Sequence, residues 1–305
     1  MSLLQDALRA FGLESAQATF IRHNENLTWQ VDGRYLLRIH QAAEGLHVDH
    51  DPGLRQAEFA FLQHLAGKGL HVQQPVAEAF LPDGTHATLL TWLEGHHYTA
   101  EAFTADVQRQ LGSMLARMQQ SAQDFRHPGL RRYDAAHARD IVNGLRTMGT
   151  RHSLNEEEIA VACAAAGGIA KRLAAAEDAF IAIHCDLNQS NVLCTPFGPA
   201  PIDFSLCGFG HPMHDLSVLL SAVRTQAERK AIAEGYTAAG GTIDLPLLDA
   251  GYTLGLLEAL VIHADKWPAE DWFAPRLTRW VNEQLRPLAQ GKAILDENMF
   301  LVHIK

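Results

Sequence analysis

The stretch "IAIHCDLNQSNVL" (residues 181–193) places polar side chains inside an otherwise apolar, strand-like run. It contains His184, Asp186 and Asn191 in the spacing H-x-D-x-x-x-x-N, and the next apolar run ends at Asp203. The segment from Asn191 to Asp203 has the length of a β-hairpin, so both side chains are expected at adjacent strand ends, facing one site. An amide oxygen and a carboxylate are hard ligands that suit Mg²⁺ when phosphate oxygens complete its coordination.

These motifs resemble the catalytic-loop and D-F-G elements of kinase-like phosphotransferases, the superfamily of aminoglycoside phosphotransferases and choline kinases. The resemblance implies that Asp186 orients the attacking hydroxyl and accepts its proton, while Asn191 and Asp203 bind the metal. It also implies that His184 braces the catalytic loop and that Asp215, in "HPMHDLSVLL", supports the same loop. The resemblance covers most of the chain.

The combination of residues carries more weight than any one of them. Asp186 alone is also explained as a turn residue or a cap, and only its combination with Asn191 and Asp203 favours a catalytic role. The sequence departs from protein kinases at Ser205, which stands where they have glycine. The following residues therefore give no indication of a movable activation segment.

The resemblance further implies a cation on the third strand that holds the nucleotide phosphates and pairs with a glutamate of the next helix. Arg38 in "YLLRIH" is the candidate, because Lys68, the only lysine before the predicted hinge, falls in a turn. Glu58 lies on the apolar face of the helix, where a carboxylate is costly unless a cation pairs with it. A structural salt bridge that binds no ligand predicts the same pair.

The loop "RHNENLTW" (residues 22–29) takes the place of a glycine-rich phosphate loop but contains no glycine. Asn26 and Thr28 carry amide and hydroxyl groups that could donate hydrogen bonds to phosphate, and an ordinary polar hairpin turn explains them equally well. The segment "LLTWLEG" (residues 89–95) resembles the hinge, whose backbone groups would bind adenine.

Acidic and aromatic residues gather near the end of the chain, in "IHADKWPAEDWF" (residues 262–273). Asp265 and Glu270 stand close to Trp267 and Trp272, and carboxylates beside indole faces suit an organic cation as the acceptor. Acids that flank a helix start, with aromatic rings packed in the core, explain the same pattern without a ligand. The acceptor stays open among aminoglycoside-, choline- and homoserine-like hydroxyl compounds.

Hydrophobic periodicity predicts the elements that must position these residues. Alternating residues and the Asp32-Gly33 turn signal predict a small antiparallel sheet. Its strands are expected at residues 18–22, 27–31, 35–40, 76–80 and 86–93, with helices at residues 2–12 and 53–67. Apolar residues at i, i+3 and i+4 then predict further helices. These cover residues 103–121, 134–148, 155–176, 213–235, 245–264 and 272–288.

We therefore expect an α+β, bilobal, protein-kinase-like fold. Residues 1–92 are expected to form the nucleotide-binding lobe, a small antiparallel β-sheet with one main helix, and residues 93–305 the larger, mostly helical lobe that carries the catalytic and acceptor-binding residues. A chain of 305 residues with 47% hydrophobic content is long enough for two cores.

Composition narrows the partners and the compartment. A net charge of −10 without a concentrated basic face argues against binding to nucleic acid. The most apolar run, residues 159–170, is too short to span a bilayer, so no membrane association is expected. The four cysteines form no C-x-x-C pair, which favours free thiols in a reducing cytoplasm. The oligomeric state is not indicated.

The motifs and the resemblance together imply a phosphotransferase that uses ATP or GTP with Mg²⁺ and moves the γ-phosphoryl group to a hydroxyl of a small molecule. A protein Ser/Thr kinase is disfavoured, because no long activation segment separates Asp203 from Asp215. A pseudokinase that binds nucleotide as a regulatory module is disfavoured, because Asp186, Asn191 and Asp203 are all present.

Overall fold

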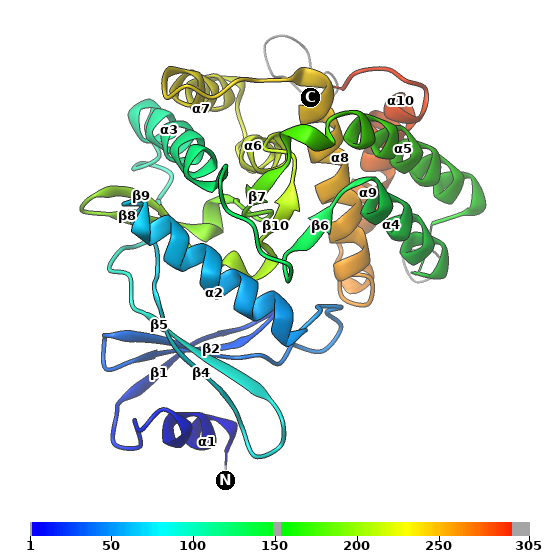
Figure 1. Cartoon of the computed structure of the whole chain (residues 1–305). Helices are drawn as coiled ribbons and strands as arrows, with labels where there is room; N and C mark the ends of the chain where they lie inside the picture. Colours follow the sequence, from blue (N-terminus) through cyan, green and yellow to red (C-terminus); the bar gives the residue numbers. More distant parts are fainter. Residues whose placement is uncertain (1, 149–153, 295–305) are drawn as a thin grey trace.

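A five-stranded antiparallel sheet forms one end of the molecule and a helical region forms the other (Figure 1). The computed structural model describes residues 2–148 and 154–294, and it confirms the α+β class predicted from the sequence. The sheet has the order β1-β2-β3-β5-β4. Its strands are β1 (Ala18–His23), β2 (Leu27–Val31), β3 (Tyr35–Ile39), β4 (Pro75–Phe80) and β5 (His86–Thr91).

The alternation of side chains along β3 determines which residues face the rest of the molecule. Leu37 and Ile39 are fully buried in a small apolar cluster with α1 (Leu3–Ala10), which covers the outer face of the sheet. Arg38 points to the opposite face, where α2 (Pro52–Gly67) lies between the sheet and the helical region (Figure 1). This face of β3 is therefore the one that contributes to a site between the two regions.

The second region consists mainly of helices, of which α4, α5 and α6 pack against α8 and α3 packs against α7. They are α3 (Ala105–Ala122), α4 (Ala135–Met148), α5 (Glu156–Ala175), α6 (Met213–Ser221), α7 (Gln226–Ala238), α8 (Leu245–Ile262), α9 (Phe273–Arg279), a π-helical turn (Trp280–Leu285) and α10 (Arg286–Ala289). By length and composition α8 could cross a membrane, but α4, α5 and α6 pack against it. Its hydropathy is thus accounted for by its place in the core.

The single helix predicted over residues 213–235 is wrong, because the chain turns between α6 and α7. The Thr225 hydroxyl accepts a hydrogen bond from the N–H of Glu228 at 3.3 Å, and the Glu228 carboxylate accepts one from the N–H of Thr225 at 2.6 Å. This capping box begins a new helix. As a result α7 packs along α3, while α6 begins beside the segment that carries Asp186.

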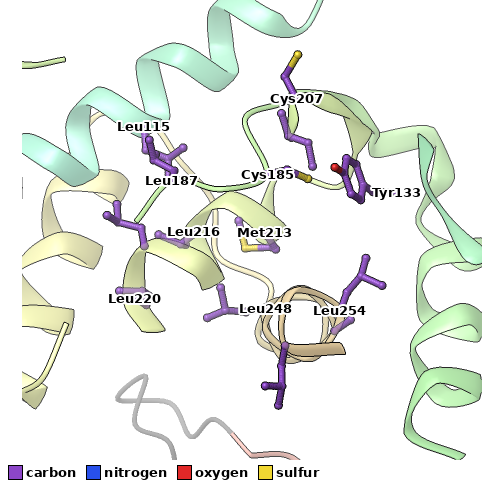
Figure 2. Close-up of a cluster of buried hydrophobic side chains, with 14 of the residues drawn as sticks. Leu115, Tyr133, Cys185, Leu187, Cys207, Met213, Leu216, Leu220, Leu248 and Leu254 are labelled. Carbon is purple, nitrogen blue, oxygen red and sulfur yellow. The ribbon is translucent and has the colours of Figure 1, made fainter. Parts of the chain in front are cut away.

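Short strands inside the helical region hold that segment in place. They are β6 (Arg131–Tyr133), β10 (Gly208–Gly210) and β7 (Ile181–Ile183) in one sheet, and the hairpin of β8 (Val192–Thr195) and β9 (Gly198–Pro201). Leu187, which follows Asp186, is fully buried in one core cluster with Leu115 of α3 and Leu216 of α6 (Figure 2). The core thus anchors the chain directly next to Asp186.

The close contact between α3 and α7 gives a stability prediction. A Cβ atom at Gly112 would lie 1.9 Å from the carbonyl oxygen of Ile232, so the two helices would have to separate. We expect Gly112→Ala to lower the free energy of unfolding by about 1–3 kcal/mol, as overpacking does. Gly167→Ala in α5 is the control, because nothing lies within 4 Å of its Cβ. Equal stabilities of the two variants in denaturant unfolding would contradict the close contact.

Candidate active site

Asp215, in the first turn of α6, holds the backbone that follows β7. Its buried carboxylate accepts hydrogen bonds from the N–H of His184 at 2.9 Å and of Cys185 at 2.7 Å. Burial raises the pKa of Asp215 to about 6, and these two N–H groups act against the rise, so the carboxylate is mostly ionised at pH 7. Cys185 has a φ of 72°, a left-handed conformation that its surroundings must hold. Asp215 therefore fixes the turn that leads to Asp186.

His184 connects this turn with the end of the β8–β9 hairpin. Its Nε2 donates to the carbonyl oxygen of Ile202 at 2.9 Å, and its Nδ1 accepts the N–H of Asp186 at 3.3 Å. The ring also packs against Phe204, with 4.4 Å between centroids. Burial lowers the pKa of His184, which keeps the ring neutral and leaves Nδ1 able to accept. His184 thus lies between the segments that carry Asp186 and Asp203.

Two side-chain amides hold the carboxylate of Asp186. Oδ1 accepts from Asn188 at 2.8 Å and Oδ2 accepts from Nδ2 of Asn191 at 2.7 Å. Burial, followed by the charge of Asp203 and then that of Glu25, raises the pKa of Asp186 to about 7. A carboxylate in this state is suited to accept a proton near neutral pH. The Nδ2 atom of Asn191 is used by Asp186, so its Oδ1 is the atom left to coordinate a cation.

Asp203 lies beside Asn191 because the N–H of Ile202 donates to the carbonyl oxygen of Asn191 at 2.9 Å, next to the β8–β9 pairing. Arg22 Nη2 donates to Asp203 Oδ2, and Arg38 Nη1 lies 3.7 Å from Oδ1. Burial acts to raise the pKa of Asp203, but the charges of Arg22 and Arg38 outweigh it and the pKa is lowered. Asp203 is therefore ionised over a wide pH range.

Arg38 forms the pair with Glu58 that the sequence predicted. Its Nη2 donates to Glu58 Oε1 at 2.7 Å, and both side chains are buried. Arg55 lies one helical turn before Glu58, with its Nη1 at 3.5 Å from Glu58 Oε2, and it is buried as well. One glutamate therefore compensates two buried guanidinium groups, one of which also reaches Asp203.

The oxygen atoms at Asp203 and Asn191 fit a hard divalent cation. Asp203 Oδ1 is buried and accepts no hydrogen bond from the residues that the structure describes. Over residues 2–148 and 154–294, no group of three or more His, Cys, Asp and Glu side chains could hold a metal ion. An ion at Asn191 and Asp203 would thus take further ligands from phosphate or water, as Mg²⁺ commonly does.

A cavity of about 300 Å³, the sheet-side cavity, opens beside Arg38 and Asp203. Asn26 and Thr28 line it, whereas Glu58 does not and acts on it only through Arg38. Asn26 Oδ1 contacts His40 Nδ1 at 2.7 Å, which holds its side chain in place. Residues of the predicted hinge also form part of the wall, namely Trp92, Leu93 and Gly95.

A larger cavity of about 570 Å³, the helix-side cavity, opens beside Asp186. Its wall includes Glu25 of the β1–β2 loop, Val48, and residues of α6, α7, α8, α9 and the π-helical turn. Glu25 lines both cavities, so they meet at the loop above Asp186 and Asp203. The site therefore consists of two compartments, with Asp186 in the wall of the helix-side cavity and Asp203 in the wall of the sheet-side cavity.

The four residues predicted to bind the acceptor are not brought together at this cavity. Trp267 lines it, but Asp265, Glu270 and Trp272 are not among the lining residues. Asp265 Oδ2 lies 2.9 Å from Nε2 of His47, in the segment between β3 and α2. The geometry therefore gives no support to a cation site built from these acids.

Three charged residues at or behind the site were not found from the sequence: Arg22, Glu25 and Arg55. Arg55 stands three residues before Glu58, and this helical spacing was a signal that could have found it. Arg22 and Glu25 lie in the glycine-free loop, where charged residues usually face solvent, and no pattern sets them apart.

Comparisons with known proteins agree with this geometry. A model of the family described as "Phosphotransferase enzyme family" matches residues 17–252. An uncharacterised protein of Deinococcus radiodurans is 29% identical over 234 residues, which are 72% of this chain. The match spans 65% of that relative's length.

Solved structures of kinases have the same fold. The amicoumacin kinase hAmiN, in complex with AMP-PNP, Ca²⁺ and Ami, is similar with a TM-score of 0.69 and 16% identity, over 91% of this chain and 89% of that chain. A microcompartment-associated aminopropanol kinase gives a TM-score of 0.65 and 20% identity, over 96% and 95% of the two chains. These likenesses confirm the kinase-like fold expected from the sequence.

The shared glutamate on α2 yields a stability prediction. Glu58→Gln leaves Arg38 and Arg55 buried without their common carboxylate, so we expect a loss of about 3–5 kcal/mol in the free energy of unfolding. Arg55→Met keeps the pair of Arg38 and Glu58 and is expected to cost less. Denaturant unfolding of both variants compares the costs, and an equal or larger loss for Arg55→Met would contradict this arrangement.

The contact between Arg22 and Asp203 yields a binding prediction. Arg22, whose side chain is 37% exposed, donates to Oδ2 of the same carboxylate that a cation would bind, so the two positive charges compete for Asp203. We expect Arg22→Gln to strengthen Mg²⁺ binding about twofold to fivefold, since an ion pair at such a position contributes under about 1 kcal/mol. Calorimetric titration with Mg²⁺ alone measures it, and Arg34→Gln on the β2–β3 turn serves as the control. Unchanged or weaker binding in Arg22→Gln would show that Arg22 does not compete.

Proposed function

Because this chain belongs to the phosphotransferase enzyme family, we propose that it transfers the γ-phosphoryl group of ATP or GTP to a hydroxyl group of a small molecule, with Mg²⁺ as cofactor. The observation that carries this proposal is the meeting of two cavities at Asp186 and Asp203. Phosphoryl transfer requires a phosphate donor and a hydroxyl to be held in line, with groups that neutralise charge between them.

The sheet-side cavity suits the nucleotide. Arg38 faces this cavity with its guanidinium held by Glu58, so its position is fixed before phosphate binds. Asn191 and Asp203 would hold Mg²⁺ there, and the ion, when bound, neutralises charge on the β- and γ-phosphates. Leu93 and Gly95 of the predicted hinge line this cavity, where they would contact the purine base, and AMP-PNP with Ca²⁺ in the amicoumacin kinase supports a nucleotide with a divalent ion.

The helix-side cavity suits the acceptor. Asp186 lines it, and amide donors hold both carboxylate oxygens, so the carboxylate cannot turn away from a bound hydroxyl. As the hydroxyl oxygen bonds to the γ-phosphorus, the bond from that phosphorus to the β,γ-bridging oxygen breaks and the nucleoside diphosphate leaves, while the hydroxyl proton passes to Asp186. His184 and Asp215 contact the backbone of this loop and do not line the cavity, which makes them supporting residues.

The size of the helix-side cavity favours a small acceptor over a protein. A volume of about 570 Å³ lies within the range of small-molecule pockets, roughly 300–1,000 Å³. Helices α6 and α8 and the π-helical turn form much of its wall. These observations support a metabolite- or antibiotic-sized alcohol as the substrate.

The test is phosphoryl transfer by Asp186→Asn. ADP release in the presence of Mg²⁺-ATP, or GDP release with Mg²⁺-GTP, is first screened against aminoglycosides, amino alcohols, hydroxy acids and sugars. With an accepted compound, we expect Asp186→Asn to lower kcat by about 10²–10⁴-fold, because the proton acceptor is lost. Nucleotide affinity should stay within about twofold, because Asp186 does not line the sheet-side cavity.

Asp178→Asn, in the short turn before β7, is the matched control and should retain full turnover. Transfer that persists in Asp186→Asn would overturn the role of this carboxylate. A wild-type protein that binds no nucleotide with Mg²⁺ would overturn the proposed function itself.

A further inference from the structure

The helix-side cavity extends along α8, well beyond Asp186. Glu258 lies at the end of the cavity near Asp186. Its Oε2 lies 3.9 Å from Nε2 of His214, and this Nε2 lies 3.9 Å from Sγ of Cys185, the residue directly before Asp186. Tyr252 lines the same cavity six residues earlier on α8, which corresponds to about 9 Å along the helix axis. An acceptor that fills the cavity therefore reaches a second group of side chains away from its reacting hydroxyl.

This second group, the distal cluster, consists of Arg229, Tyr252, Arg276 and Gln284, all of which line the cavity. They come from α7, α8, α9 and the π-helical turn. Burial raises the pKa of Tyr252 to about 12, while a hydrogen bond with Gln284 and the charges of Arg229 and Arg276 act against this rise. The two guanidinium groups and the amide thus line the same cavity as this phenol and act on it.

Arg229 brings a buried positive charge to this end of the cavity. Its side chain is only 8% exposed. Nε donates to the carbonyl oxygen of Leu220 at 3.1 Å and Nη2 donates to that of Val223 at 3.0 Å, just past the end of α6. No carboxylate of the described residues lies within 4.0 Å of this guanidinium. The two carbonyls explain how Arg229 is held, and the charge of the neighbouring Glu228 acts on the guanidinium without forming an ion pair with it.

Arg276 adds a second guanidinium that forms no ion pair with an acid in the described part of the chain. It lies over the indole rings of Trp272 and Trp280, at 5.3 Å and 5.9 Å from their centroids. The neighbouring Arg279 differs, because its Nε lies 3.6 Å from the carboxylate of Glu283. Two planar guanidinium groups at one wall of the helix-side cavity are well suited to bind a carboxylate or a phosphate.

Gln284 supplies an unsatisfied acceptor beside these cations. The residue is 6% exposed, and its Oε1 is buried without a hydrogen-bond partner among the described residues. It lies on the π-helical turn Trp280–Leu285, a rare backbone form that recurs at functional sites. A buried amide oxygen without a donor is costly, so a bound group that donates a hydrogen bond there would be stabilised.

We propose that the acceptor carries an anionic group, a carboxylate or a phosphate, which Arg229 and Arg276 bind at the distal cluster, next to a hydrogen-bond donor that contacts Gln284. This inference rests on the proposed function, because it assigns the helix-side cavity to the acceptor. The reacting hydroxyl lies against Asp186 and the anionic group lies at the distal cluster, farther along the cavity. The substrate class is thus a hydroxylated acid or phosphate ester, in contrast to the organic cation suggested by the acids at residues 265–271.

Linear probes of graded length test the binding part without any turnover. We would titrate the whole protein calorimetrically, without nucleotide, with ω-hydroxy carboxylates of four to eight carbons. The corresponding ω-hydroxy amides, ω-amino alcohols and ω-hydroxyalkyl phosphates complete the set. We expect one or both anionic series to bind at least about tenfold more tightly than the amides, as hydrogen bonds to charged groups allow. The series that binds distinguishes a carboxylate site from a phosphate site.

Arg276→Gln is the deciding variant, because Arg229 also holds the end of α6 and its removal could unfold the region. We expect Arg276→Gln to weaken anionic probes by about tenfold and to leave the amides unchanged. Arg286→Gln removes the same charge from α10, where Arg286 pairs with Glu157 outside the cavity, and should have no effect. With an accepted substrate, Arg276→Gln should raise KM and spare kcat.

Several results would overturn the inference. They are equal binding of anionic, neutral and cationic probes, no binding by any anionic probe, or equal effects of Arg276→Gln and Arg286→Gln. Failure of the proposed function would be seen in a different measurement, namely the absence of Mg²⁺-dependent nucleotide binding in the sheet-side cavity. The two hypotheses can therefore fail separately.

Discussion

The guanidinium of Arg38 is the contact on which the arrangement of the site depends. It comes from β3 and reaches Glu58 on α2 and Asp203 at the end of the β8–β9 hairpin. β3 and α2 follow each other in the chain, whereas the hairpin comes much later, and all three meet at one buried cation. Because an unpaired charge at such a position costs several kcal/mol, the sheet, α2 and the hairpin have few other ways to pack. The sheet-side cavity lies between the sheet and the hairpin as a consequence.

Around this contact, three aspartates differ in their electrostatic surroundings and therefore in what they can do. Asp203 faces Arg22 and Arg38 and stays ionised, which suits a ligand for a cation. Asp215 accepts two backbone N–H groups in the core and only holds the loop. Asp186 faces a cavity with no cation against its carboxylate, and its pKa of about 7 suits proton transfer. Burial is common to all three, and the neighbouring groups set their roles.

The sequence predicted the parts of the site that depend on local spacing. The resemblance to kinase-like phosphotransferases pointed to Arg38 on the third strand, and the position of Glu58 on the apolar face of the helix supplied its partner. The length of one hairpin was sufficient to bring Asn191 and Asp203 together. The break between α6 and α7 was also readable from the capping box at Thr225, but the apolar spacing across it concealed the signal. The distal cluster was not predictable, because its residues come from α7, α8, α9 and the π-helical turn, and only the packing of these helices brings the charges to one wall.

The central claim is that a divalent ion and a triphosphate bind between Asn191, Asp203 and Arg38, with the γ-phosphate facing Asp186. Its most direct test is an anomalous difference map from crystals grown with Mn²⁺ and AMP-PNP. We expect one Mn²⁺ peak within coordination distance of Asn191 Oδ1 and Asp203, with Arg22 displaced and the nucleotide in the sheet-side cavity. An ion bound elsewhere, or a nucleotide in the helix-side cavity, would contradict this account.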